Sequence, residues 1–237
     1  MRWIPSAVIA LAIAALLLYG PIPQAPAYHR FADTRGIAGV PNAGDVLSNL
    51  AFLAVAAWGL ARTRRYRVFL IGVGLTSLGS AYYHLAPDNA RLVFDRLPIA
   101  IACAGLLAGV HADTHARHPR WMLPALVAFA IAGVLWWSWT ESRGAGDLRP
   151  YLLLQGAPLV LIPLWQAIHG SGRHERLAFG VAIALYVLAK LAEAADRAIF
   201  DALGFVSGHT LKHLLAATAA AVIVAALKRG RGPTARP

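Results

Sequence analysis

Two pairs of polar side chains in otherwise apolar segments have the spacing of residues that share one helix face. Ser80 and His84 are four residues apart, and so are His209 and His213, so in helices each pair projects from one side. Three neutral imidazoles and one water make up a catalytic zinc site with an open position. Zinc lowers the pKa of its water to about 7, which makes hydroxide available at neutral pH. These residues therefore predict a metal-dependent hydrolytic site.

Two further side chains fit such chemistry. Asp95, near the start of another apolar segment, could take the proton of that water and pass it to a leaving amine. Ser80 could donate a hydrogen bond to the oxyanion of a tetrahedral intermediate. An H-x-x-x-H pair alone is a modest signal, because a histidine near a helix end is commonly an interfacial side chain. Ionisable groups inside apolar spans are costly, however, and by default mark a functional site.

The elements that must position these residues are membrane spans. Of the 237 residues, 58% are hydrophobic and 14% are charged, whereas a soluble domain has about a quarter charged residues. The formal net charge is +11, but the basic residues occupy short loops and form no basic face with interleaved aromatics. We therefore expect no nucleic-acid partner. The single cysteine, Cys103, lies in an apolar segment and excludes a disulfide within the chain.

Eight apolar segments approach or reach the roughly 18 residues that cross a bilayer. Backbone groups in hydrocarbon must be paired internally, so each segment should be helical, and the period-two alternation of a barrel strand is absent. The sequence predicts an all-α integral membrane protein with a seven-transmembrane-helix core and an extra N-terminal helix. The segments are 4–19, 46–61, 68–85, 94–111, 121–139, 151–168, 177–194 and 209–227.

The first segment allows two interpretations. Arg2, a short apolar core and Ala25-Pro26-Ala27 resemble a signal peptide with its cleavage site, but the same segment could be a retained helix. We expect retention. The predicted organisation is then an N-terminal transmembrane helix or signal anchor, a seven-helix domain and a basic cytoplasmic tail, over residues 1–27, 28–227 and 228–237.

Loop charges predict the orientation of the spans. With eight crossings, most basic residues and the C-terminal tail fall on one side, which should be cytoplasmic. His84 then ends a helix that runs outward, while Asp95, His209 and His213 lie near the starts of helices that run inward. All of them are expected at one depth near the outer face, which is the periplasmic face of a bacterial inner membrane. Spacing alone does not say whether these helices touch.

The pattern Ser80-x-x-x-His84, Asp95 and His209-x-x-x-His213 resembles the signature of the CREST superfamily of membrane hydrolases. This superfamily includes alkaline ceramidases, the progestin and adipoQ receptors and haemolysin-III-like proteins. The resemblance covers most of the chain from residue 28 to residue 227. It is closest to the alkaline ceramidase branch, through the stretches 36–42, 45–49 and 80–96.

The resemblance implies a seven-helix core with zinc held by His84, His209 and His213. It implies Asp95 near the zinc-activated water and Ser80 as an oxyanion or structural partner. The implied reaction is hydrolysis of a linear amide C–N bond, the N-acyl bond of ceramide or a related lipid, with release of a fatty acid. The implied partners are this lipid substrate and the surrounding membrane lipids.

The chain departs from the resemblance at the family's calcium site. Eukaryotic alkaline ceramidases bind calcium through an acidic, tryptophan-containing segment before the first core helix. Here that segment contains few acids, and Asp33 and Asn42 are the residues that could take equivalent positions. Because calcium takes six to eight oxygen ligands, we expect zinc as the cofactor and do not expect calcium.

Three functions remain open from the sequence. The first is a zinc-dependent lipid amidase, and the second is a lipid-binding receptor or sensor of the adipoQ-receptor or haemolysin-III type with little turnover. The third is a membrane protein that zinc stabilises without catalysis. Asp95 and Ser80, which a closed four-ligand structural site would not need, favour the amidase. The sequence does not indicate the acyl length, the head group or the oligomeric state.

A further set of charged residues, Lys190, Glu193 and Asp196, is spaced three apart near the outer end of the seventh segment. These side chains could line a polar passage beside the zinc. They could also form a local ion pair that neutralises charge at the membrane boundary. We favour the ion pair.

Overall fold

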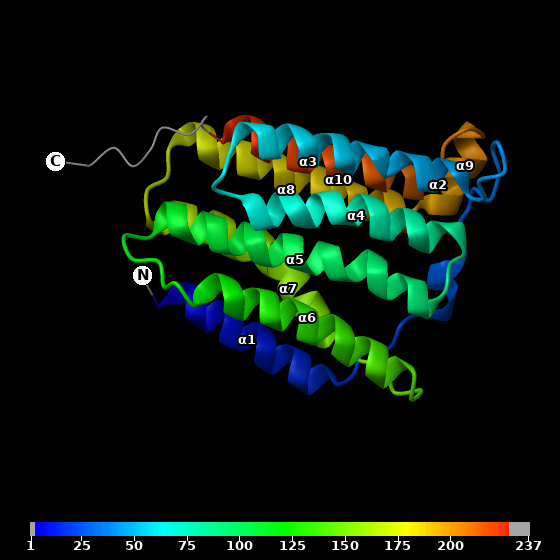
Figure 1. The fold of residues 1–237 in the computed structure, drawn as a ribbon. Coiled ribbons are helices and arrows are strands. Elements are labelled where there is room, and N and C mark those ends of the chain that lie inside the picture. The colour runs from blue at the N-terminus through cyan, green and yellow to red at the C-terminus, as the bar shows by residue number, and fades with distance from the viewer. Residues whose placement is uncertain (1–2, 228–237) are drawn as a thin grey trace.

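The computed structural model describes residues 3–227, which form a bundle of helices lying side by side (Figure 1). Seven spans are long and apolar enough to cross a membrane, with α2 and α3 together counting as one. This confirms the all-α seven-helix core and the extra N-terminal helix, whereas the tail expected at 228–237 lies outside the described residues. The elements are α1 (Ile4–Tyr19), the 3₁₀ turn η1 (Pro26–His29), α2 (Ala43–Ser48), α3 (Leu50–Arg62), α4 (Arg67–Leu85), α5 (Asn89–Thr114), α6 (Met122–Glu141), α7 (Arg149–Ile168), α8 (Arg173–Ala194), α9 (Asp196–Leu203) and α10 (Gly208–Ala226).

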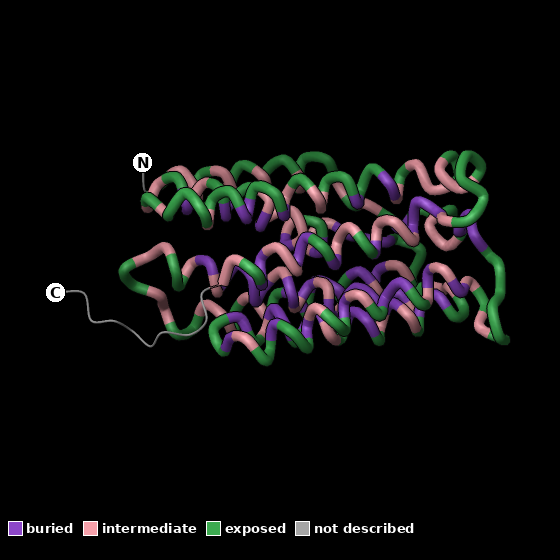
Figure 2. Tube along the Cα trace, turned by 90° about the horizontal axis from the view of Figure 1, so that it is seen from above, coloured by how far each residue is buried: buried purple, intermediate pink, exposed green. Residues whose placement is uncertain are grey.

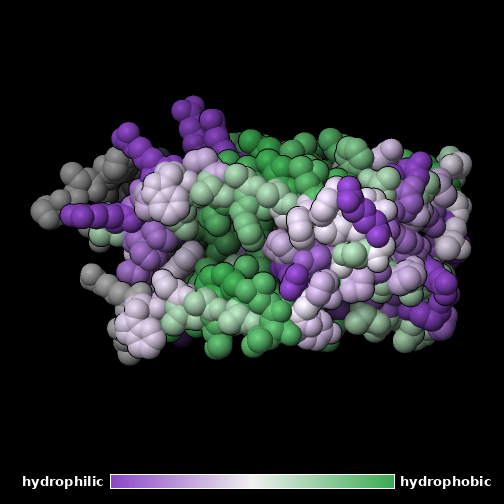
Figure 3. Space-filling model, turned by 90° about the horizontal axis from the view of Figure 1, so that it is seen from below, coloured by the Kyte–Doolittle hydropathy of each residue, from purple (hydrophilic) through white to green (hydrophobic). Residues whose placement is uncertain are grey.

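The surface of the bundle is that of a protein surrounded by lipid. Buried residues face the interior between the helices, and exposed residues face outward (Figure 2). Large apolar side chains are nevertheless exposed along the spans, among them Leu78, Leu135 and Leu188. Figure 3 shows an apolar band, hollowed on this face, with hydrophilic groups at both ends. Such a band matches the hydrocarbon core of a bilayer between two head-group layers.

Small residues bring α4 and α5 into backbone contact. A Cβ atom at Gly72 would lie 2.6 Å from the backbone nitrogen of Ala102, and one at Gly79 would lie 1.9 Å from the carbonyl oxygen of Phe94. Membrane helices pack through such close contacts because lipid tails are as apolar as the side chains, so apolar burial alone does not hold the helices together. The contact holds the end of α4 that carries His84 against the part of α5 that carries Asp95.

The start of α5 differs from the sequence-based expectation. The helix begins at Asn89 and not at the first apolar residue, because Asp88 caps it by accepting a hydrogen bond from the backbone N–H of Arg91 (2.7 Å). Asp95 therefore lies almost two turns inside the helix. Asp95 is 5% exposed, so it lies deeper in the bundle than expected for the second residue of a segment that begins at residue 94.

The N-terminal helix is connected to the core by its linker. α1 packs against α7, and the carbonyl oxygen of Ile22 accepts a hydrogen bond from the backbone N–H of Leu148 (2.8 Å). Gln24 is buried and accepts a hydrogen bond from Arg96 on α5. Cleavage after Ala27 would remove these contacts.

Candidate metal centre

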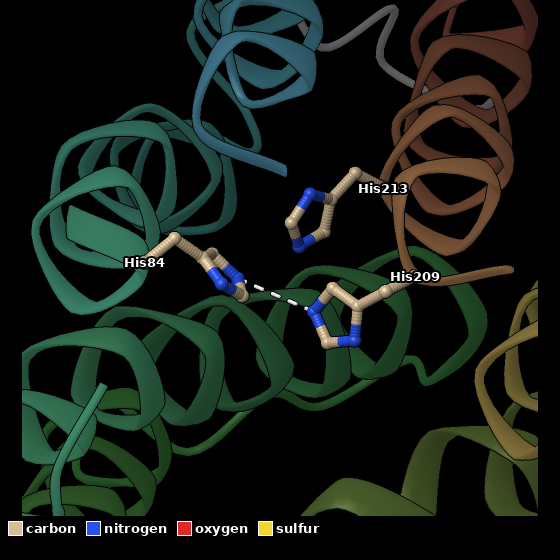
Figure 4. Close-up of side chains that lie close together, drawn as sticks. All are labelled: His84, His209 and His213. Carbon is tan, nitrogen blue, oxygen red and sulfur yellow. Dashed lines mark hydrogen bonds between the residues drawn. The ribbon is translucent and has the colours of Figure 1, made fainter. Parts of the chain in front are cut away.

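The three histidines of the sequence pattern meet at the end of the bundle where α2 and α9 lie. His84 comes from the last turn of α4, and His209 and His213 come from the first turns of α10. Their rings point toward one another in Figure 4, and one nitrogen from each lies within 4.8 Å of the other two. The closest pair is Nε2 of His84 and Nε2 of His209, at 3.2 Å. All three side chains are at most 4% exposed.

The first turn of α10 is held by acceptors on both sides. Ser207 caps the helix, since its hydroxyl oxygen accepts from the backbone N–H of Thr210 (2.9 Å). Asp196 accepts from the backbone N–H of His209 (2.8 Å) and, through its other oxygen, from that of Ala32 (2.8 Å). The N-terminus of α10 and the loop before α2 are thus fixed to one carboxylate.

The hydroxyl of Ser48 determines which nitrogen of His213 is free. Ser48 donates its proton to the carbonyl oxygen of Asp45 (3.0 Å), so its oxygen accepts from Nδ1 of His213 (2.8 Å). Nδ1 of His213 then carries the hydrogen, and the lone pair of Nε2 is available to a metal ion. Such a partner also fixes the orientation of a metal-binding imidazole.

A second buried carboxylate strengthens the same corner. Asp45 is 0% exposed and accepts hydrogen bonds from the hydroxyls of Thr210 (2.7 Å) and Ser207 (3.2 Å). These bonds join α2 to α10. The ring of Phe31 lies edge-on to both His84 and His209, with centroids 4.6 Å apart in each case. The cluster is therefore supported by polar contacts on one side and covered by an apolar ring on another.

The distance between two of the histidine nitrogens fits a tetrahedral metal ion. Zinc–nitrogen bonds of about 2.0–2.1 Å in a tetrahedron place two ligand nitrogens roughly 3.3 Å apart, close to the 3.2 Å between His84 and His209. Among the described residues the group contains three imidazoles and no carboxylate. A metal ion in this group would keep one coordination position for another ligand, and Asp95 is outside the group.

Lys212 is the residue that the sequence reasoning missed. Its ammonium donates hydrogen bonds to Nε2 of His209 (2.8 Å) and to the carboxylate of Glu193 (2.9 Å). A metal ion bound to Nε2 of His209 needs the same lone pair, so Lys212 would have to give up this hydrogen bond. Its ion pair with Glu193 would then hold the Lys212 ammonium. A lysine inside an apolar span, three residues after His209, is itself a signal of function that the sequence offers.

Glu193 is the centre of a small charged network. It pairs with Lys190 as well as with Lys212, which agrees with the favoured ion pair. The hydroxyl of Tyr28 also donates to it (3.4 Å). Burial, together with the nearby carboxylate, raises the pKa of Tyr28 well above its usual range, so this hydroxyl stays protonated. Asp196 is not in the ion pair and instead accepts the hydrogen bond from the backbone N–H of His209 at the start of α10.

A cavity of about 440 Å³ borders the cluster through His213. Ser80 and Asp95 line it, and so do Lys212 and Glu193. The structure therefore brings the five residues of the sequence pattern to one region, three as a metal-binding group and two in the adjacent wall. Much of the remaining wall is apolar and includes Val73, Ile99, Leu106, Leu159, Ile183 and Ile223.

The two candidate calcium ligands already have partners. The guanidinium of Arg35 forms an ion pair with Asp33 (2.8 Å), and its hydrogen bonds lower the pKa of that carboxyl below its usual range. The side-chain amide of Asn42 donates to the carbonyl oxygen of His84 (2.7 Å) and so holds the end of α4. Both residues lie near the metal-binding group, and each has a structural role there.

Comparisons of the chain with models of known protein families, with curated proteins and with solved structures give no match. The resemblance to the CREST superfamily therefore rests on the residues of the chain itself. What the structure adds is that His84, His209 and His213, which are distant in sequence, form one buried group that could hold a metal ion.

Proposed function

We propose that the protein is a zinc-dependent membrane amidase that hydrolyses the N-acyl bond of ceramide or a related lipid. The observation that carries the proposal is the buried group of His84, His209 and His213 beside a largely apolar cavity. The described residues supply three imidazoles and no further ligand to this group, which is typical of catalytic and not of structural zinc. The resemblance to membrane hydrolases supplies the reaction class.

The chain's own residues have distinct roles in this proposal. Zinc held by the histidines would supply a Lewis acid and a water of lowered pKa. Asp95, in the cavity wall, accepts the proton of the attacking water and returns it to the leaving amine. Ser80 donates a hydrogen bond to the amide oxygen as negative charge develops there. One amide and one water thus give one carboxylic acid and one amine.

The cavity supports a lipid as the substrate. Its polar residues gather near the histidines, and its apolar residues extend along the spans, as an acyl chain would require. One face of the bundle has a hollow within its apolar band (Figure 3), and an opening of this kind would let a substrate with long tails enter from the bilayer. We place the site at the periplasmic face of a bacterial inner membrane, with the C-terminus in the cytoplasm, because basic loops mark the cytoplasmic side.

The test is release of fatty acid from a panel of N-acyl lipids, ceramides included, by the purified full chain. His213→Ala is compared with His174→Ala, which changes an exposed histidine at the start of α8. Zinc content is measured on every sample. We expect the wild type and His174→Ala to bind zinc and release fatty acid, and His213→Ala to lose both.

Two outcomes would contradict the proposal in different ways. Bound zinc without release from any lipid would favour a lipid-binding receptor or a structural site. An intact protein that binds no metal ion would remove the basis of the site. Restoring activity by adding zinc after treatment with a chelator would link the reaction to the metal and not to the fold alone.

A further inference from the structure

Arg96 is a buried cation without a carboxylate partner in the described part of the chain. It is 5% exposed, and none of the ion pairs found there within 4.0 Å includes it. Its Nη2 donates to the neutral amide oxygen of Gln24, while its Nη1 is buried and has no hydrogen-bond partner. A buried guanidinium is costly unless it is paired with a counter-ion.

Aromatic rings surround this guanidinium. Its carbon lies 4.0 Å from the ring centroid of Trp137, 5.3 Å from that of Tyr151 and 5.5 Å from that of Tyr28. Cation–π attraction offsets part of the desolvation of the charge. The indole N–H of Trp137 is also buried without an acceptor, so two neighbouring side chains each hold an unused donor. A carboxylate, whose oxygens accept charge-assisted hydrogen bonds, is the group that matches the unused Nη1 donor of Arg96.

The Arg96 cage, formed by Arg96 with Trp137, Tyr28 and Tyr151, borders the same cavity as the metal centre through three of its four members. Arg96, Tyr28 and Tyr151 line the same cavity as Asp95 and His213. Tyr28 contacts both ends of this region, since its ring faces Arg96 and its hydroxyl reaches Glu193, the partner of Lys212. A ligand whose amide lies at the histidines can therefore have its head group near the Arg96 cage.

The charges of the cavity wall also favour an anionic ligand. Three cations and two carboxylates line it, so the wall has an excess of positive charge even before a metal ion is counted. They are Arg96, Lys190 and Lys212 against Asp95 and Glu193. Because Asp95 directly precedes Arg96, a ligand with two negative charges would be repelled there. A single carboxylate is thus favoured over a phosphomonoester.

We propose that the Arg96 cage binds a carboxylate on the head group of the lipid, so that the substrate is an N-acyl amino acid and not a neutral ceramide. This inference rests on the proposed amidase function and narrows its substrate class. The neutral amide of Gln24 occupies one donor of Arg96, and the carboxylate binds the donor that is left. Gln24 lies in the linker after α1, which makes the N-terminal segment part of the head-group site.

The inference is tested by binding, with probes that lack the N-acyl bond of the substrate. A long-chain 4-oxo acid has the shape of an N-acyl glycine with a methylene in place of the amide nitrogen, and its primary amide differs from it in charge. Dissociation constants of both are measured on the zinc-loaded full chain. We expect the wild type to bind the acid at least tenfold more tightly than the amide. Equal affinity for the two would overturn the inference without any variant.

Variants then assign the preference to Arg96. Arg96→Gln is expected to abolish the preference for the acid and to leave the affinity for the amide within twofold. Arg91→Gln, on the same helix but paired with Asp88 outside the cavity, is the control and should keep the preference. A preference that survives in folded Arg96→Gln would overturn the inference. If Arg96→Gln does not fold, the inference is judged by the affinities of the wild type for the acid and for the amide.

A third probe separates two sources of the carboxylate. A saturated fatty acid of the same length stands for the released product, and we expect its affinity to change less than threefold in Arg96→Gln. A loss as large as that of the 4-oxo acid would assign Arg96 to the product and overturn the head-group assignment. If the protein proves not to be an amidase, the dissociation constants of these probes are unaffected, so the two proposals fail separately. Hydrolysis of ceramide as fast as N-acyl glycine would overturn this inference alone.

Discussion

Replacement of Gly79 by alanine would force α4 and α5 apart. The new Cβ would lie 1.9 Å from the carbonyl oxygen of Phe94 and 2.7 Å from its carbonyl carbon. Cβ atoms essentially never come closer than 3.0 Å to such atoms, so the two helices must separate by about 1.1 Å. The obstructing atoms belong to the backbone, and no change of rotamer can relieve the contact.

The expected loss follows from two opposing terms. Overpacking costs about 1–3 kcal/mol, and a backbone clash of this size belongs at the upper end. Alanine in a helix recovers about 1 kcal/mol relative to glycine. The net destabilisation is then about 2 kcal/mol. Because Ser80 and Asp95 flank this contact, a shift of about 1 Å should also lower the rate of hydrolysis by on the order of 100-fold.

The matched control is Gly156→Ala in α7, where an added Cβ meets no atom within 4 Å. Both variants are unfolded by denaturant in detergent, and fatty acid release is measured in parallel. We expect Gly156→Ala to be as stable as the wild type or up to about 1 kcal/mol more stable. Equal stability and activity of Gly79→Ala and Gly156→Ala would refute the backbone contact between α4 and α5.

Three further changes give separable results. Ser48→Ala removes the partner of Nδ1 of His213 and should weaken metal affinity by about 10–100-fold, measured by competition with a chelator. Unchanged affinity would mean that Ser48 does not orient this ring. Asp95→Asn should retain the metal ion and lose about 10²–10⁴-fold in hydrolysis, and loss of the metal would make Asp95 a ligand instead. Asp33→Asn should lose up to about 1 kcal/mol at neutral pH, because the half-exposed partner Arg35 limits the strength of the pair. Since Arg35 lowers the pKa of Asp33, this contribution is present above the usual carboxyl pKa and disappears as the pH falls through the lowered value. A difference between Asp33→Asn and the wild type that persists in acid would contradict the assignment.

The sequence was sufficient for the fold class and for bringing the histidines to one level of the bundle. Apolar segments of span length predicted the seven helices, because a bilayer leaves few alternatives for the backbone. Spacing of four residues placed His209 and His213 on one face, and the alternation of basic loops placed His84 at the same level. Their assembly into one group confirms that the faces as well as the levels agree.

Other features of the site depend on helix rotation and approach, which sequence patterns do not encode. The contact of Ser48 with His213 joins α2 to α10, and that of Lys212 with Glu193 joins α10 to α8, at angles that are set by packing. The start of α5 was placed five residues too late, because hydropathy detects the apolar stretch and not the polar first turn capped by Asp88. The Arg96 cage unites four segments and has no local signature.

Because the chain is synthesised from its N-terminus, α10 enters the membrane after the helices that carry its partners. His84 and His209 are 125 residues apart, and Asp45 receives its hydroxyl partners from Ser207 and Thr210 at the start of α10. Until α10 enters the membrane, the earlier helices hold a buried carboxylate and a lone imidazole without these partners. α10 therefore completes the histidine group and gives Asp45 its two hydroxyl donors, so a metal ion that needs all three imidazoles can bind only after α10 has inserted.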